Sequence, residues 1–287
     1  MYNIRHLLRS TIILKDIYRF LSIIKNKTLL DIIFNIKMFF RFIGICDIRY
    51  KGLKKYKNAH LGSRCFIVAT GPSLTIEDLL KLKDEITFGM NSLCTVFAEL
   101  QFETTYFGIQ DYSVYTKLES QINAINISNV FIGDRIEKLL NKKTEFNIFP
   151  LDYMNHKITY EKLSAKFSPD IYYRVYDGYT ITYSILQIVS YMGFKEVYLV
   201  GADCNYSDDK TKHHFSDYGH YDPTYKTAGQ RMIFAYKKAR AYADSHNIKI
   251  YNATRGGMLE VFPRVDLDEV LGLSTKEIGK LKDEVNS

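Results

Sequence analysis

From residue 64 onwards, short runs of apolar residues alternate with longer segments in which apolar residues recur every three or four positions. Continuous short runs predict buried strands, and the periodic segments predict amphipathic helices. The runs predict strands over residues 65–68, 86–91, 104–109, 129–133, 146–150, 196–201 and 248–252. The periodic segments predict helices over residues 75–82, 180–192, 225–246 and 266–282. This alternation predicts an α/β fold, with a Rossmann-like, open, mostly parallel sheet that carries helices on both faces.

The first 60 residues follow a different pattern. Apolar stretches at 11–14, 21–24, 29–34 and 38–43 are interrupted by single cations. None approaches the roughly 20 apolar residues that a membrane-spanning helix needs. They predict two or three basic amphipathic helices, which either lie on an anionic membrane surface or pack on the domain or on a second subunit. We therefore expect a helical arm over residues 1–60, ending in a polar connector at 46–62, and a Rossmann-like domain over residues 61–287.

The positive charge is confined to this arm. Residues 1–57 hold 13 Lys and Arg against three Asp, a net charge of +10, whereas the other 230 residues hold 26 against 29 acids, a net charge of −3. No nucleic-acid-binding motif accompanies the basic residues, so we expect no nucleic-acid partner. The start of the chain lacks an uninterrupted apolar stretch with a cleavage site, which predicts no signal peptide. The cysteines are scattered, which favours a reducing cytosol over a disulfide or zinc framework; they are Cys46, Cys65, Cys94 and Cys204.

The turn that follows the first strand of the domain is the strongest candidate for ligand binding. It reads Thr70-Gly71-Pro72-Ser73 and opens into a helix whose start has capping-box spacing at Thr75 and Asp78. Glycine lets a ligand approach the backbone, and the free N–H groups of a helix start favour a phosphate. The alternative is an ordinary strand-to-helix turn. The turn matches neither a Walker loop nor the three-glycine dinucleotide fingerprint.

Several predicted strands end on polar residues. Because ligands of open parallel sheets bind beyond the carboxyl ends of the strands, these residues predict a shared crevice. They are Thr70, Asn91, Gln110, Asp111, Asp203, Asn252 and Thr254. Arg255 follows the last strand, where it either binds a phosphate or carboxylate or is an exposed turn cation.

The polar loop over residues 204–225 brings three histidines within eight residues: His213, His214 and His220. Their spacing does not fit a structural zinc site, so we expect no metal ligands. One histidine acting as a proton acceptor fits better, because the reference pKa of imidazole suits that role near neutral pH. A tyrosine-rich segment over residues 151–177 could form one wall of the site.

Several stretches together resemble one superfamily. They are IVATGPSL at 67–74, FGMN at 88–91, MGFKEVYLVGAD at 192–203, HF at 214–215 and NATRGG at 252–257. This set resembles the bacterial lipooligosaccharide sialyltransferases. It also resembles a related group that includes flagellin-glycosylation proteins and the archaeal-type 6-hydroxymethylpterin diphosphokinases. The resemblance covers about residues 64–264.

The resemblance to the sialyltransferases implies roles for individual residues. It implies that Gly71, Pro72, Ser73 and Asn91 hold the CMP part of a sugar donor and that His214, before Phe215, is the catalytic base. His213 and His220 remain alternatives, as acceptor or phosphate contacts or as the base. The stretch Thr180–Tyr183 departs from the Thr-Ser-Gly of those enzymes, which alters the donor contacts.

We therefore expect a cytoplasmic glycosyltransferase on the inner face of the plasma membrane. It would move a sialic-type nonulosonic acid from a CMP-sugar to a lipopolysaccharide or capsule precursor. Tyr173 or Tyr183 would stabilise the leaving phosphate. No cofactor is obligatory, because a CMP leaving group needs less charge neutralisation than a diphosphate. The alternatives are a pterin diphosphokinase that uses ATP and Mg²⁺, with Asp111 and Asp203 as its acids, and a non-catalytic nucleotide-sugar-binding assembly protein.

Overall fold

The protein is built on a seven-stranded parallel sheet with the strand order β5-β4-β3-β2-β1-β8-β9. The computed structural model describes residues 29, 31–45, 48–140, 146–153, 166–206, 215–216, 219, 225–274, 277 and 279. The strands are β1 (Arg64–Val68), β2 (Thr87–Met90), β3 (Tyr106–Ile109), β4 (Val130–Gly133), β5 (Asn147–Phe149), β8 (Glu196–Val200) and β9 (Lys249–Asn252). The bounds of all seven strands lie within two residues of the predicted bounds, and the expected α/β fold is confirmed.

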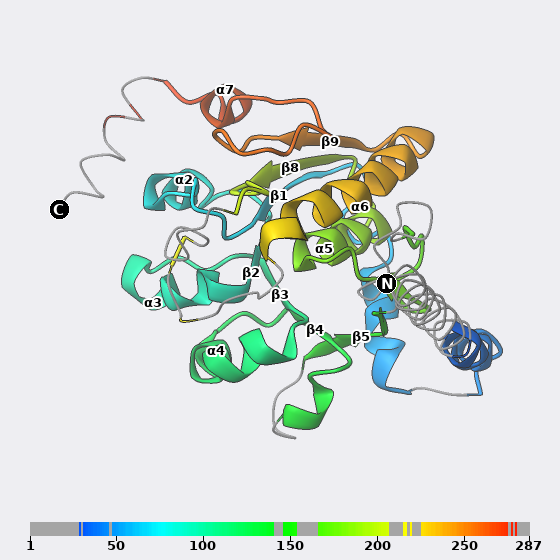
Figure 1. The fold of residues 1–287 in the computed structure, drawn as a ribbon. Helices are drawn as coiled ribbons and strands as arrows, with labels where there is room; N and C mark the ends of the chain where they lie inside the picture. The colour runs from blue at the N-terminus through cyan, green and yellow to red at the C-terminus, as the bar shows by residue number, and fades with distance from the viewer. Residues whose placement is uncertain are drawn as a thin grey trace, which may run out of the picture.

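Helices cover both faces of the sheet (Figure 1). On one face α5 (Ile181–Tyr191) and α6 (Tyr225–Ser245) pack into a core with the residues of η1 (Ile48–Tyr56). On the other face α2 (Ile76–Lys81), α3 (Phe97–Leu100), α4 (Tyr112–Ala124) and α7 (Leu267–Leu271) contribute to a second core. A separate pair of short parallel strands, β6 (Leu151–Asp152) and β7 (Val175–Tyr176), follows β5 and precedes α5. Two further 3-10 helices are η2 (Asn91–Thr95) and η3 (Glu137–Leu139).

The prediction of a polar connector over residues 46–62 is wrong for residues 48–62, which the structure describes. In η1 the side chains of Tyr50, Leu53 and Tyr56 are almost fully buried. They recur every third residue, which is the period of a 3-10 helix. Residues 58–62 then hydrogen-bond to the turn after α5, from Asn58 N to Tyr191 O and from His60 N to Met192 O. The segment is therefore part of the packed domain.

The closing helix is shorter than the predicted 266–282. Asp266 caps the start of α7, and the helix ends after Leu271 because Gly272 adopts a left-handed backbone with φ of 66°. Ser274 and Glu277 then exchange capping hydrogen bonds, which mark a new helical turn. One glycine thus divides a segment whose apolar period suggested a single helix.

Residues 31–42 form a helix that lies beside the α/β domain (Figure 1). The Arg41 guanidinium donates to the Tyr173 carbonyl at 2.6 Å, and Arg174 donates to the Asn35 side chain at 2.6 Å. These contacts hold the helix against the segment that precedes α5. Within the described residues, no helix combines the length and the apolar character required to cross a bilayer.

His60 makes the packing of residues 58–62, after η1, sensitive to pH. Its Nε2 lies 2.6 Å from the Tyr106 hydroxyl, its ring stacks on Phe194, and burial lowers its pKa below the ordinary 6.5. The folded state therefore binds fewer protons than the unfolded state, so this contribution is complete above pH 6.5 and is lost as the pH falls below it. We expect the free energy of unfolding, measured by urea titration, to fall between pH 7.5 and 5.5. A His60→Gln variant should show a flatter dependence, and an unchanged slope would contradict this assignment.

Candidate functional site

The candidate site lies where the strand order reverses. β1 pairs with β2 on one side and with β8 on the other, and five residue pairs join β1 to β8, from Arg64↔Glu196 to Val68↔Val200. The chain proceeds outward from β1 to β5 and then returns to the other side of β1. In open α/β sheets this switch point leaves a crevice at the carboxyl ends of the strands. The Gly-Pro-Ser turn after β1 and the Gly-x-Asp turn after β8 therefore face each other.

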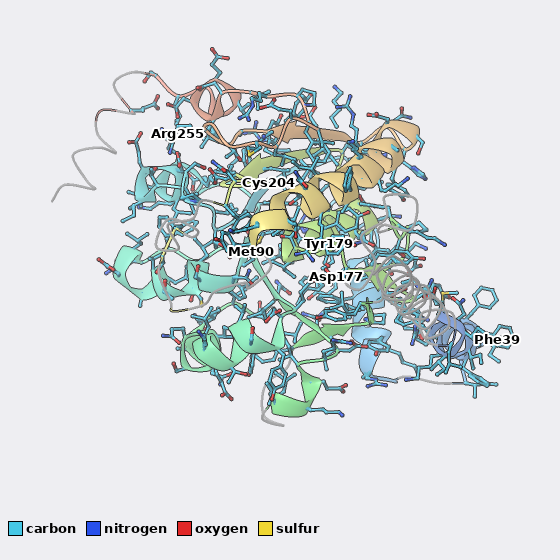
Figure 2. The ribbon with its side chains drawn as sticks, in the orientation of Figure 1. Phe39, Met90, Asp177, Tyr179, Cys204 and Arg255 are labelled. Carbon is cyan, nitrogen blue, oxygen red and sulfur yellow. The ribbon has the colours of Figure 1, made fainter. Side chains whose placement is uncertain are left out.

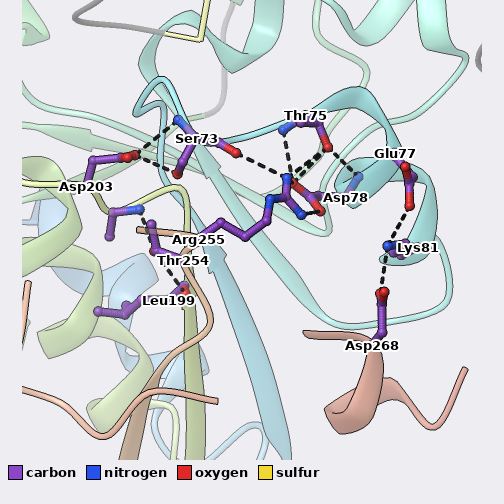
Figure 3. A network of polar contacts seen from close by, with 11 residues as sticks. Ser73, Thr75, Glu77, Asp78, Lys81, Leu199, Asp203, Thr254, Arg255 and Asp268 are labelled. Atoms are coloured by element: carbon purple, nitrogen blue, oxygen red, sulfur yellow. Dashed lines mark hydrogen bonds and ion pairs between the residues drawn. The ribbon is translucent and has the colours of Figure 1, made fainter. Parts of the chain in front are cut away.

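These two turns are in direct contact (Figure 3). The Gly71 N–H donates to the Gly201 carbonyl at 2.8 Å. The Ser73 hydroxyl donates to Asp203 Oδ2 at 2.8 Å, and the Ser73 N–H lies 3.4 Å from the same oxygen. A β-carbon on Gly71 would lie 2.0 Å from Asp203 Oδ2 and 2.5 Å from the Gly201 carbonyl oxygen. Position 71 therefore has room for glycine alone, because Asp203 and the Gly201 carbonyl approach its backbone.

Asp203 is the buried acid of this turn. Burial raises the pKa of its carboxyl group, while the hydrogen bonds from Ser73 oppose that shift. Its own backbone is fixed by the Met258 N–H, which donates to the Asp203 carbonyl at 2.7 Å. The carboxylate thus accepts the hydrogen bond of the Ser73 hydroxyl and orients the turn.

A second network fixes the start of α2 (Figure 3). The predicted capping box is confirmed: Thr75 accepts from the Asp78 N–H, and Asp78 accepts from the Thr75 N–H. Arg255 reaches over from the turn after β9 and donates to both oxygens of the buried Asp78, at 2.7 and 2.6 Å. It also donates to the Ser73 carbonyl at 3.2 Å. Arg255 therefore lies beside the Gly-Pro-Ser turn with its guanidinium paired to Asp78. The sequence did not reveal this ion pair, because its partners are 177 residues apart.

The other strand-end residues have distinct surroundings. Asn91 directly follows β2 and begins η2 with a φ of 48°, and its buried Oδ1 has no hydrogen-bond partner in the part of the chain that the structure describes. Gln110 donates to Asp177 at 3.2 Å and accepts from the Ser184 hydroxyl at 2.6 Å. Asp111 caps α4 through the N–H groups of the first helical turn. The sequence analysis did not single out Asp177, because no motif around it distinguishes it from the other acidic residues.

Two strand-end residues near β9 have structural partners. Thr254 accepts from the Ala202 N–H at 2.9 Å, and the Asn252 side chain donates to the Leu259 carbonyl at 2.7 Å. The first bond joins the turn after β9 to the turn after β8, and the second lies within the turn after β9. The carboxyl edge is therefore connected from β1 to β9 by hydrogen bonds between its turns.

The loop after β8 returns across this edge. The Phe215 N–H donates to the Thr70 carbonyl at 2.9 Å, directly before Gly71. Thr95, beyond β2, donates to the Ser216 hydroxyl at 3.1 Å, and Lys117 of α4 donates to the Gly219 carbonyl. His213, His214 and His220 lie outside the described residues. Phe215, the residue after His214, is nonetheless held beside the Gly-Pro-Ser turn by its bond to Thr70.

The two tyrosines expected at the site have other contacts. Tyr183 is fully buried in the core, where its hydroxyl donates to the Lys166 carbonyl at 3.0 Å and burial raises its pKa. The Tyr173 ring lies 6.0 Å from the Phe42 ring, and its carbonyl accepts from Arg41. Of the tyrosine-rich segment, residues 154–165 lie outside the described residues. In this structure neither hydroxyl therefore makes a contact with the Gly-Pro-Ser turn.

Candidate metal ligands are dispersed along the described part of the chain. No group of three or more His, Cys, Asp or Glu side chains is placed there to hold a metal ion. The chain has an Asp-x-Asp at Asp266–Asp268, in which Asp266 caps α7 and Asp268 pairs with Lys81 at 2.6 Å. At the switch point itself, the Ser73 hydroxyl and the N–H groups of Gly71 and Ser73 bond to Asp203 and Gly201, so an anion bound there would replace some of these bonds.

Comparison with known proteins gives one family and one solved structure. The model of the family described as 6-hydroxymethylpterin diphosphokinase MptE-like matches residues 45–209, more than half of the chain, from η1 through β8. No curated protein matches. The solved structure of the MAf glycosyltransferase from Magnetospirillum magneticum AMB-1 matches with 16% identity and a TM-score of 0.48. The match covers 82% of this chain but only 40% of that protein.

Proposed function

The chain belongs to the 6-hydroxymethylpterin diphosphokinase MptE-like family, and from this premise we propose that it transfers a group from a nucleotide-activated donor. Within that class we propose a glycosyltransferase that moves a sialic-type nonulosonic acid from a CMP-sugar to a lipopolysaccharide or capsule precursor. The matched range ends within the loop after β8, so it includes both turns of the switch point.

One observation carries the proposal. The loop that holds the three histidines is bonded to the carbonyl of Thr70, immediately before Gly71. A donor phosphate that replaces Asp203 as the acceptor of the Ser73 hydroxyl and N–H would then lie beside this loop, where His214, the residue before Phe215, would supply the imidazole. The Asn91 amide, whose buried oxygen has no partner among the described residues, would contact the donor from the end of β2.

The proposed reaction is a displacement at the anomeric carbon. The acceptor hydroxyl oxygen forms the new bond to that carbon, while His214 takes the hydroxyl proton. The bond from the anomeric carbon to the CMP phosphate oxygen breaks, and CMP leaves with that electron pair. The helix start and the Ser73 hydroxyl would stabilise the charge that develops on this phosphate.

The description of the family favours a second candidate, the transfer of diphosphate from ATP to a hydroxymethylpterin. This reaction would need Mg²⁺, which prefers carboxylate and phosphate oxygens. Asp203 and Asp111 lie at the carboxyl ends of β8 and β3, and each carboxylate already accepts hydrogen bonds within the protein. A kinase would have to exchange at least one of these bonds for the metal ion.

Ligand-induced stabilisation distinguishes the two candidates. We expect CMP to raise the unfolding temperature without Mg²⁺, with about 2.7 kcal/mol of stabilisation at a ligand concentration 100 times the Kd. ADP, UDP and GDP serve as controls. Stabilisation by ATP with Mg²⁺ but not by CMP would contradict the glycosyltransferase and support the diphosphokinase. No response to any nucleotide would contradict both.

A further inference from the structure

The helix over residues 31–42 exposes an apolar face. Nine of the twelve large hydrophobic side chains that are exposed in the described residues lie between residues 29 and 45. They are Leu29, Ile32, Ile33, Ile36, Phe39, Phe40, Phe42, Ile43 and Ile45. Ile32, Ile36, Phe39 and Ile43 recur at intervals of four, three and four residues, which places them on one stripe of a helix.

The opposite side of the helix is docked on the domain. The Arg41 guanidinium lies over the Phe34 ring at 5.6 Å and over the Tyr50 ring of η1 at 5.2 Å. The Arg174 guanidinium lies 4.4 Å from the centre of the same Phe34 ring. Because Phe34, Met38 and Arg41 form the stripe opposite to Ile36 and Phe39, the contacts with the domain turn the apolar stripe outward. Figure 2 shows Phe39 on the periphery of the molecule.

The helix and the neighbouring η1 carry more cations than acids. Lys37 is an exposed cation of the helix, and η1, on the docked side, adds the exposed Lys51, Lys54 and Lys55. Arg49 of η1 is paired with Glu137 at 2.7 Å. Arg49 lies over the same Tyr50 ring that Arg41 contacts, so the basic residues of η1 begin beside the end of the helix. Residues 29–57 contain seven Lys and Arg against two Asp, in contrast to the net negative charge of the remaining domain.

We propose that this face, Ile32, Ile36, Phe39 and Ile43 with Ile33 and Phe40 beside them, docks on the surface of an anionic lipid bilayer. Isoleucine and phenylalanine side chains would enter the boundary between headgroups and acyl chains while the lysines contact anionic headgroups. An exposed contiguous apolar surface marks an interaction site. The excess of cations favours a lipid surface over a second copy of this face, because two such faces would bring like charges together. The inference is independent of the proposed reaction.

Flotation of the full chain with vesicles tests the proposal. We expect binding to phosphatidylcholine vesicles that contain phosphatidylglycerol, weaker binding to phosphatidylcholine alone, and loss of binding as the salt concentration rises. The triple variant Ile36→Gln/Phe39→Gln/Ile43→Gln should weaken binding by about tenfold for each side chain replaced. A Lys37→Glu/Lys51→Glu variant should bind the anionic vesicles more weakly than the wild-type chain does.

The matched control is Leu61→Gln/Met258→Gln, which removes two apolar side chains elsewhere that are at least as exposed and should leave vesicle binding unchanged. Unfolding temperatures of all variants should match the wild type, since every replaced side chain is exposed. Equal binding of the triple variant and the wild type would overturn the proposal. So would a wild-type dimer that the triple variant abolishes, without vesicle binding by either, because a second copy would then cover the face.

Discussion

Replacing Gly71 with alanine is expected to weaken nucleotide binding by at least about a hundredfold, the equivalent of one or two lost hydrogen bonds to a charged group. The added β-carbon would lie 2.0 Å from Asp203 Oδ2 and 2.5 Å from the Gly201 carbonyl oxygen. Neither atom can move freely, since Asp203 is held by Ser73 and Met258 and Gly201 belongs to the backbone after β8. The turn itself must therefore shift, which would displace the Ser73 hydroxyl and N–H from the proposed phosphate site. Isothermal titration with CMP measures the effect.

The matched control is Gly52→Ala in η1. There the nearest atom to an added β-carbon, Asn147 Oδ1, is 3.9 Å away, which is an ordinary contact. This variant should bind CMP as the wild type does. Ser73→Ala removes one hydroxyl without adding atoms, so it remains informative should Gly71→Ala fail to fold, and we expect it to bind CMP about tenfold more weakly. Wild-type affinity in a folded Gly71→Ala variant would contradict the proposed phosphate site.

His214→Ala is expected to reduce kcat by about 10²–10⁴, the contribution typical of a general base, with little change in CMP affinity. The reason is positional: the Phe215 N–H, one residue further along the chain, is bonded to the Thr70 carbonyl beside the proposed donor site. The acid limb of the pH profile of kcat should also disappear, because it reports the protonation of the imidazole. Transfer from CMP-sialic acid to a lipooligosaccharide precursor, measured as released CMP, provides the assay.

The comparison among the three histidines separates the catalytic base from its neighbours. His213→Ala and His220→Ala should each retain most of the activity. If His220→Ala loses activity and His214→Ala does not, the base is misassigned although the reaction stands. If all three variants transfer at the wild-type rate, the proposed mechanism is wrong.

The sequence predicted well what is locally encoded. Each strand of the main sheet was visible as a short apolar run, because a parallel strand buried on both faces needs no polar alternation. The Thr75–Asp78 capping box could also be predicted, because both partners lie within one helical turn. The helix α4 was equally readable from Val114, Leu118 and Ile122 and was overlooked.

The contacts that shape the site were not readable in this way. The pairs Arg255–Asp78 and Gln110–Asp177 join segments 177 and 67 residues apart, and they depend on which strands become neighbours. The sequence predicted that strand ends would meet, but not that β8 would pair with β1. The role of η1 was hidden by its lysines, which face outward while Tyr50, Leu53 and Tyr56 enter the core.

The pairing of β1 with β8 also determines when during synthesis the site can exist. Val68 meets Val200, 132 residues further along the chain, so a nascent chain that has emerged only as far as β5 contains the Gly-Pro-Ser turn without the Gly201 carbonyl or the Asp203 carboxylate. Contacts of such long range form late, because the intervening chain must first be closed into a loop. A growing polypeptide on the ribosome would therefore remain unable to capture its ligand until β8 has left the exit tunnel.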